Sequence, residues 1–193
     1  MEPKLKEAKQ GKRNVFFVDA AHFVWGAYLG YLWCIVRLFI PSPSGRKRYN
    51  VLGALDVINQ ELITIKNDAY INSHSIVELI DKIIETNIKN PITLVMDNAK
   101  YQRCEFVQNH AKNVGVELLF LPSYSPHLNI IERLWKWMKK DCLYSKYYDS
   151  FDKFQKAIDK SAEKINNQID NNETGDLFAL NFQSFSKAQI YTV

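Results

Sequence analysis

The short apolar run Ile92–Met96, followed at once by Asp97 and Asn98, constrains the fold more than any other part of the sequence. An all-apolar run of this length is typical of a strand buried on both faces of a parallel sheet, with polar residues at its carboxyl end. A helix is predicted from about residue 101 to 113, and a second buried strand over residues 116–121. Strand, helix and strand form a β-α-β unit, which predicts a pair of parallel strands.

The part of the chain before this unit reads as a series of strands with short connections. Apolar runs predict strands at residues 14–21, 31–40, 49–57 and 61–65, and a helix at 73–87. Short connections between consecutive strands favour antiparallel pairing. The expected fold class is therefore α/β, a mixed sheet flanked by helices.

Size and composition indicate a single soluble domain. The 193 residues suffice for one buried core. We expect a polar leader or linker remnant at residues 1–13, the domain at 14–170 and a C-terminal tail at 171–193. The sequence has neither a signal-peptide core nor an apolar run of about 18 residues, so we predict a cytoplasmic protein without a membrane partner. Its three cysteines form no C-x-x-C pair, which argues against a disulfide framework or a cysteine zinc site.

Three acidic residues, Asp19, Asp97 and Glu132, are candidates for a functional site. Asp19 ends the apolar run Val15–Asp19, and a buried lone carboxylate is costly unless a partner compensates its charge. That partner is either a metal or a backbone or arginine donor. Glu132 follows Asn129 at the spacing of a capping box, so a purely structural capping glutamate is also open. Three carboxylates from two strands and a helix are what a pair of divalent cations requires.

Positive charge is concentrated in two places, although the net charge of the chain is only +4. The helix predicted to begin near Asn129 leaves three lysines on its polar side, namely Lys136, Lys139 and Lys140. A loop between predicted strands carries Arg46, Lys47 and Arg48, which either contact phosphates or are merely solvated. The distribution favours an anionic partner.

The string Leu121-Pro-x-Tyr-Ser-Pro-x-Leu-Asn-x-Ile-Glu132 carries a resemblance to a known family. With Asp19 in an early strand and 34 residues between Asp97 and Glu132, it resembles the catalytic domain of insertion-sequence transposases of the Tc/mariner superfamily. The resemblance covers residues 14–165 and departs at Ile130, where the family pattern often has proline. It implies a ribonuclease-H-like fold, a five-stranded mixed sheet with the first three strands antiparallel.

The same resemblance implies a reaction and a cofactor. Asp19, Asp97 and Glu132 would be the catalytic residues and would hold two Mg²⁺ or Mn²⁺ ions, which suits their hard oxygen ligands. The reaction would be strand cleavage at transposon ends followed by strand transfer into target DNA. Asn98 would orient a metal-bound water or cap the next helix, and both alternatives are open. Tyr124 is a candidate for stacking on a base, and the basic residues named above are candidates for contacts with the DNA backbone.

The resemblance also implies partners. These transposases carry an N-terminal helix-turn-helix region that reads the inverted repeats, and we expect that region to be absent from this chain, as in the second half of a split or frameshifted transposase. Transposon-end and target DNA, a homodimer on paired ends, and a prokaryotic, nucleoid-associated location are implied as well. Two other functions are open: another ribonuclease-H-like nuclease that does not join strands, and a non-catalytic DNA-binding or assembly fragment of a decayed transposase.

Overall fold

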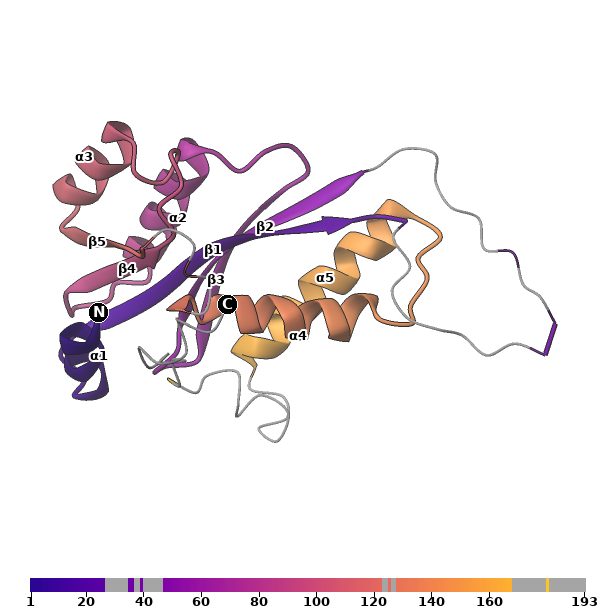
Figure 1. The fold of residues 1–193 in the computed structure, drawn as a ribbon, viewed down its shortest axis with the longest axis horizontal. Coiled ribbons are helices and arrows are strands. Elements are labelled where there is room, and N and C mark those ends of the chain that lie inside the picture. The colour runs from indigo at the N-terminus through magenta and orange to yellow at the C-terminus, as the bar shows by residue number, and fades with distance from the viewer. Residues whose placement is uncertain are drawn as a thin grey trace, which may run out of the picture.

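A five-stranded sheet in the order β3-β2-β1-β4-β5 forms the centre of the molecule (Figure 1). The computed structural model describes residues 1–26, 35, 36, 39, 47–122, 125, 128–167 and 180. Its strands are β1 (Asn14–Val24), β2 (Arg48–Asp56), β3 (Glu61–Asn67), β4 (Ile92–Met96) and β5 (Val116–Phe120). β2 is antiparallel to both of its neighbours, β1 and β3, whereas β4 is parallel to β1 and β5. The predicted mixed sheet, antiparallel first and parallel afterwards, is confirmed.

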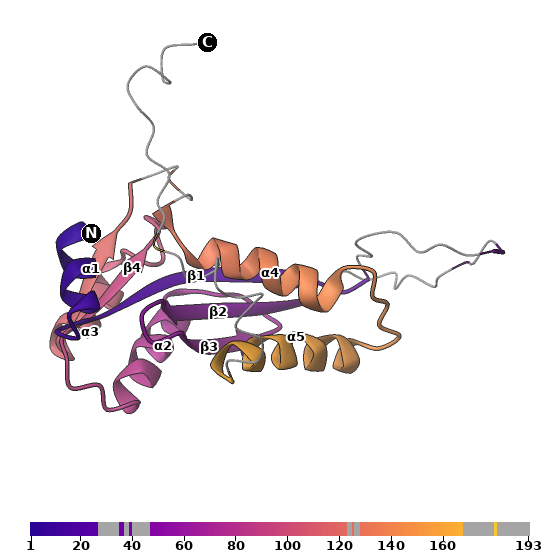
Figure 2. The ribbon, with the colours of Figure 1, turned by 90° about the horizontal axis from the view of Figure 1, so that it is seen from below.

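Helices cover both faces of this sheet (Figure 2). They are α1 (Glu2–Lys9), α2 (Ser73–Glu85), α3 (Glu105–Asn113), α4 (Ile131–Leu143) and α5 (Phe151–Asn166). β1 sends Phe16 and Val18 into the core beneath α2 and α3, and Phe17 and Ala21 into the core beneath α1, α4 and α5. Because strand side chains alternate between faces, Asp19 lies on the α4 side. No helix in the described part of the chain is long and apolar enough to cross a membrane.

The N-terminal segment differs from the prediction of a polar leader at residues 1–13. Residues 2–9 form α1, whose Leu5 and Ala8 are buried in the core beside β1. Arg13 links the end of this segment to α1 through an ion pair with Glu7, 2.6 Å long. Two apolar positions in a charged segment are too few to indicate an amphipathic helix. The domain limits at residues 13 and 170 remain predictions.

Two further predictions concern segments that the structure describes only in part. Of the strand predicted at residues 31–40, only Ile35, Val36 and Phe39 are described; they are exposed and belong to no strand. The strand that pairs with both β1 and β3 is β2, which corresponds to the strand predicted at residues 49–57. Of the predicted tail at 171–193, all but Leu180 lies outside the described residues.

Candidate active site

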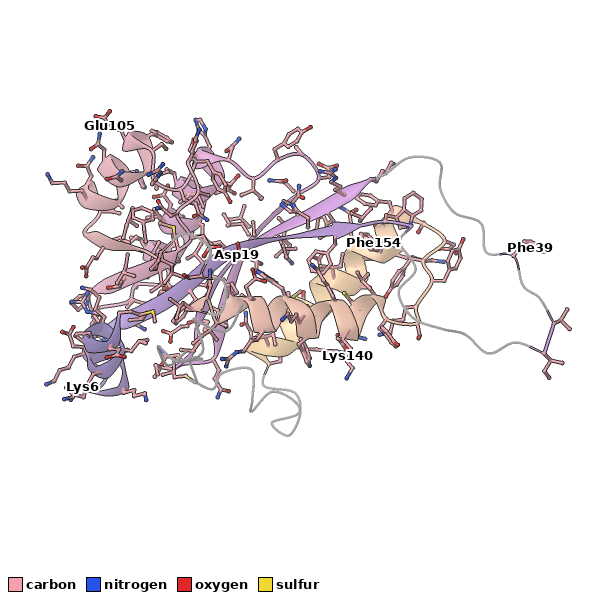
Figure 3. The ribbon with its side chains drawn as sticks, in the orientation of Figure 1. Lys6, Asp19, Phe39, Glu105, Lys140 and Phe154 are labelled. Atoms are coloured by element: carbon pink, nitrogen blue, oxygen red, sulfur yellow. The ribbon has the colours of Figure 1, made fainter. Side chains whose placement is uncertain are left out.

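The parallel pairing of β1 with β4 brings two of the three candidate carboxylates together. Val18 is paired with Met96 at the end of this ladder, so Asp19 and Asp97 are the next residues on neighbouring strands. Neighbouring strands lie about 4.8 Å apart, which makes the two residues adjacent. Asp19 is located near the middle of the molecule, between β1 and α4 (Figure 3).

The third carboxylate, Glu132, is supplied by the first turn of α4. This helix lies on the Asp19 side of the sheet because Ile131, Leu134 and Met138 are fully buried in that core. The capping alternative for Glu132 is wrong, since the N-cap of α4 is Ile130 and no side chain caps the helix. The amide of Asn129 makes its hydrogen bonds elsewhere, as described below.

The carboxyl group of Asp19 has a strongly raised pKa. Its pKa is raised to about 7, chiefly by burial and also by the charges of Glu132 and Asp97, while the backbone N–H of Ala20 and the indole of Trp135 oppose the shift. Within the described residues, no three acidic, histidine or cysteine side chains stand close enough together to hold a metal ion as they are. The two observations agree because Coulomb interactions extend beyond a coordination distance of about 2.0–2.6 Å.

Two side chains that the sequence did not single out as functional donate hydrogen bonds to the carboxylates of Asp19 and Asp97. The indole Nε1 of Trp135 donates to Asp19 Oδ2 at 3.1 Å. The amide Nδ2 of Asn129 donates to Asp97 Oδ1 at 3.1 Å and to the carbonyl oxygen of Val18 at 3.2 Å. One signal could have found them: both lie three residues from Glu132, on either side of it.

Tyr101 is a further neighbour of the site that the sequence did not reveal. Burial raises the pKa of its phenol, and the charges of Asp19 and Asp97 raise it further, which places the ring near both. Asn98 is exposed, and the next helix, α3, has Cys104 as its N-cap. The capping alternative for Asn98 is therefore wrong, and its role in orienting a water remains a prediction.

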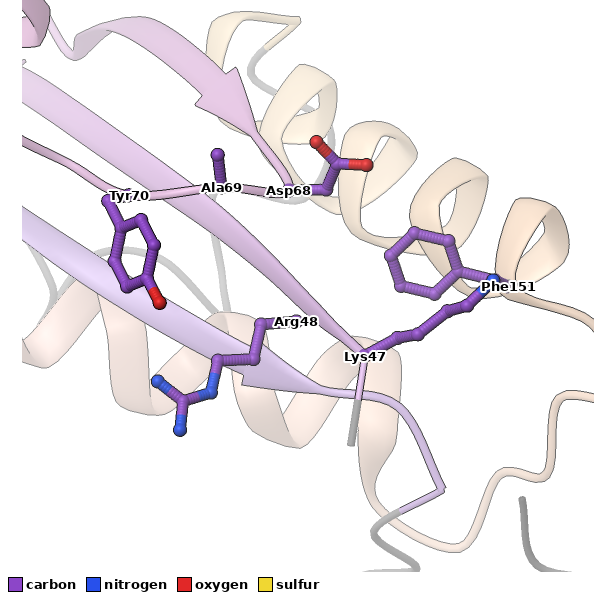
Figure 4. A pocket seen from close by; sticks show the side chains of 6 residues that line it. All are labelled: Lys47, Arg48, Asp68, Ala69, Tyr70 and Phe151. Atoms are coloured by element: carbon purple, nitrogen blue, oxygen red, sulfur yellow. The ribbon is translucent and has the colours of Figure 1, made fainter. Parts of the chain in front are cut away.

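The predicted DNA-contacting residues fall into two regions. Lys136, Lys139 and Lys140 are exposed on α4, and Lys140 extends outward from the helix (Figure 3). Lys47 and Arg48 line a cavity of about 460 Å³ together with Tyr70 and Phe151 (Figure 4), and Lys47 Nζ lies 5.4 Å from the centre of the Phe151 ring. Arg46 and Tyr124 lie outside the described residues.

Comparison with known proteins identifies the family. The DDE superfamily endonucleases match residues 8–155, most of the chain. Among solved structures, the Mos1 transposase catalytic domain with raltegravir and Mg superimposes with a TM-score of 0.57 at 14% identity, covering 96% of this chain and 92% of that one. The Mos1 mariner paired-end complex with Mn gives a TM-score of 0.58 at 14% identity, with 86% and 57% covered. No curated protein sequence matches significantly.

The chain therefore belongs to the DDE superfamily endonucleases. The ribonuclease-H-like fold inferred from the sequence is confirmed, since the Mos1 catalytic domain superimposes on this chain. The narrower resemblance to transposases of the Tc/mariner type stays a prediction. The chain spans 57% of the length of the Mos1 transposase in its paired-end complexes.

Proposed function

We propose that this domain cuts DNA at transposon ends and transfers the cut strands into target DNA, in a reaction that requires divalent metal ions. One observation carries the proposal: the parallel pairing of β1 with β4 makes Asp19 and Asp97 neighbours, on a sheet against which α4 packs, and the first turn of α4 carries Glu132. The three candidate carboxylates therefore come from neighbouring elements of a chain that belongs to the DDE endonucleases, which supports a shared role for them.

Asp19, Asp97 and Glu132 are the proposed ligands of two Mg²⁺ or Mn²⁺ ions. Carboxylate oxygens are the donors that these hard cations prefer, so the residues fit the group. Bound there, a pair of divalent cations would activate an attacking oxygen and stabilise the leaving oxygen of a phosphodiester. Tyr101 is protonated at neutral pH because its pKa is raised, so its phenol can donate a hydrogen bond but cannot serve as a general base.

The lysines of α4 are proposed to contact the DNA backbone. Lys140 is eight residues beyond Glu132, about 12 Å along the helix axis, and Lys136 and Lys139 lie between them. A phosphate chain that passes Glu132 along α4 would meet all three. Lys47 and Arg48, at the start of β2, would contact DNA farther from the carboxylates. Arg46, which precedes them in the sequence, is also proposed to contact the DNA backbone. Such contacts give affinity without sequence specificity, whereas Tyr124 is the proposed base-stacking residue.

Recognition of particular DNA ends is proposed to reside in a helix-turn-helix region separate from this domain. This proposal is supported by how much of each Mos1 chain the superposition covers. It covers 92% of the isolated Mos1 catalytic domain but only 57% of the Mos1 chain in the paired-end complex. A homodimer on paired ends belongs to the same proposal.

Calorimetric titration with Mn²⁺ tests the metal site. The wild type is expected to bind, Asp97→Asn to lose most of the affinity, and Asp152→Asn, an exposed carboxylate on α5, to bind as the wild type does. Equal binding by all three proteins would refute the proposed ligand set.

A DNA assay separates the proposed reaction from its alternatives. A pre-cleaved end of the element with a free 3′-hydroxyl is incubated with a target plasmid and Mn²⁺, and joined products are counted against nicked ones. Joining that Glu132→Gln abolishes supports a transposase. Nicking without joining would favour a simple nuclease, and DNA binding without either product would favour a non-catalytic fragment.

A further inference from the structure

We propose that Asn129 and Trp135 are positioning residues, which orient the carboxylates of Asp97 and Asp19 for metal binding. The inference rests on the proposed function, because it assigns a task to residues around the same site. It extends that function because the first turns of α4 would then both carry one proposed metal ligand, Glu132, and orient the other two, Asp19 and Asp97.

The spacing of the residues supports this assignment. Asn129, Glu132 and Trp135 follow one another at intervals of three, and positions three apart lie on one side of a helix. Asn129 immediately precedes the N-cap of α4, and its carbonyl oxygen accepts a hydrogen bond from the backbone N–H of Glu132 at 3.2 Å. A single rigid segment thus presents a carboxylate flanked by two N–H donors.

Trp135 has chemistry that suits a positioning role. Trp135 is 2% exposed, and from α4 its Nε1–H donates to Asp19 Oδ2 on β1, 116 residues away in sequence. An indole N–H is a donor only, so it can neither bind a cation nor accept a proton. What it can do is fix one oxygen of Asp19 and thereby the direction of the other. Donors of this kind around metal ligands commonly affect metal affinity.

Asn129 acts on the neighbouring strand in the same way. It is 2% exposed, and its Nδ2 bridges the carbonyl oxygen of Val18 on β1 and the carboxylate of Asp97 after β4. Its own Oδ1 is buried and has no hydrogen-bond partner among the described residues. A buried acceptor without a partner is destabilising, so packing alone does not favour an asparagine here. The hydrogen bond that its Nδ2 donates to Asp97 does favour an asparagine at this position.

Paired substitutions on one helix separate positioning from packing. Trp135→Phe keeps a large aromatic ring in the core and removes the N–H, while Trp137→Phe makes the same change two residues on, at a half-buried position that packs against the same core. We expect Trp135→Phe to weaken Mn²⁺ binding in calorimetry by about tenfold or more, and Trp137→Phe to leave it within twofold. Equal affinities of Trp135→Phe and the wild type would overturn the inference.

An NMR measurement tests the contact without metal, and so is independent of any loss of affinity through misfolding. The indole N–H signal of Trp135 is the one that Trp135→Phe removes from the spectrum. At a pH above about 8, where Asp19 is ionised, we expect Asp19→Asn to shift this signal more than the other indole signals, because it replaces a charge-assisted hydrogen bond by a neutral one. An unmoved Trp135 signal would overturn the inference.

The outcomes also separate this inference from the function on which it rests. Mn²⁺ binding by the wild type, unchanged in both Trp135→Phe and Asn129→Leu, would leave the proposed function intact and refute the positioning roles. Absence of Mn²⁺ binding by the wild type would refute both. Loss of affinity in both variants, with Trp137→Phe unaffected, would support the inference.

Discussion

A substitution at Gly53 tests how closely α4 packs on the sheet. Gly53 lies on β2 directly opposite Asp19 of β1, and the ring of Trp135 rests on it. A Cβ added at Gly53 would stand 2.7 Å from Trp135 Cη2, 2.9 Å from Cζ2 and 3.2 Å from Ile131 Cδ1. Since carbon atoms in contact prefer separations of about 3.5–4.0 Å, the indole would have to move by roughly 1 Å. The substitution Gly53→Ala therefore presses on the residue that holds Asp19.

The expected sign of the stability change is opposite to that of an ordinary glycine-to-alanine substitution. Where the backbone is compatible, Gly→Ala raises the free energy of unfolding by about 0.4–1 kcal/mol, because the unfolded chain loses freedom. Overpacking a buried site lowers it by about 1–3 kcal/mol. Trp135 and Ile131 are both buried and cannot swing into solvent, so overpacking prevails. We expect a net loss of about 1–2 kcal/mol and a fall in Tm of roughly 2–8 °C.

Urea denaturation of the metal-free protein measures the effect, and a double-mutant cycle identifies its cause. Phenylalanine has no atoms equivalent to Cζ2 and Cη2 of the indole, so Trp135→Phe makes room for the new methyl group. Gly53→Ala should then cost less in the Trp135→Phe background than in the wild type, by at least about 0.5 kcal/mol. A Gly53→Ala protein as stable as the wild type, or identical costs in the two backgrounds, would refute the reasoning.

Four further predictions follow from individual contacts. The pKa of Asp19 is about 7 in the folded protein and ~3.9 when unfolded, so its favourable contribution to the stability of the metal-free protein is complete below about pH 4 and is lost as the pH rises through 7. In urea denaturation, Asp19→Asn should remove this dependence of stability on pH, and at pH 8 it should be more stable than the wild type by up to about 4 kcal/mol. Parallel pH profiles of the two proteins would contradict this prediction. Asp56 is buried and accepts hydrogen bonds from the side chains of Asn14 and Asn59 at 2.9 and 2.8 Å, so Asp56→Ala should lower the free energy of unfolding by about 3 kcal/mol, and a loss below about 1 kcal/mol would count against this network. Replacing Lys136, Lys139 and Lys140 by glutamine should weaken DNA binding at low salt and reduce the slope of log K against log[salt] by up to about 3, as measured by fluorescence anisotropy; an unchanged slope would place the DNA elsewhere. Burial raises the pKa of the Cys142 thiol to about 12, so mass spectrometry should find this residue unmodified by iodoacetamide in the native protein at pH 8 and modified in urea; rapid native alkylation would contradict that burial.

The sheet was predictable because its signals are local. The apolar run Ile92–Met96 predicted a strand buried on both faces, and all five of its residues are buried in the structure. The period of two in β1 predicted that Phe17 and Ala21 share one face, and both lie in the core beneath α4. Given the parallel pairing of these strands, the adjacency of Asp19 and Asp97 follows from the position of each at the end of an apolar run.

The supports of the site were not predictable because they depend on contacts between distant segments. The sequence around Trp135 indicates only a buried stripe on a helix, and the isolated Gly53 in a strand indicates only a weak position or a close approach. Their relation appears when α4 packs on β2 and leaves no room for a Cβ. The capping-box spacing at Asn129 likewise misled, since the tertiary contacts with Val18 and Asp97 prevailed over the local cap.

Stability and the proposed metal binding make opposite demands on this site, and hydrogen-bond donors around Asp19 would reconcile them. Burial disfavours the charged form of Asp19, as its raised pKa records, although metal binding requires that form. The indole N–H of Trp135 and the backbone N–H of Ala20 favour the carboxylate of Asp19 over the neutral acid, and the amide of Asn129 donates a hydrogen bond to Asp97. A site of bare carboxylates in an apolar core would bind protons in preference to metal at neutral pH. Because Asn129 and Trp135 lie on the segment that carries Glu132, packing of this segment onto the sheet would supply the third carboxylate together with the two side-chain donors to Asp19 and Asp97.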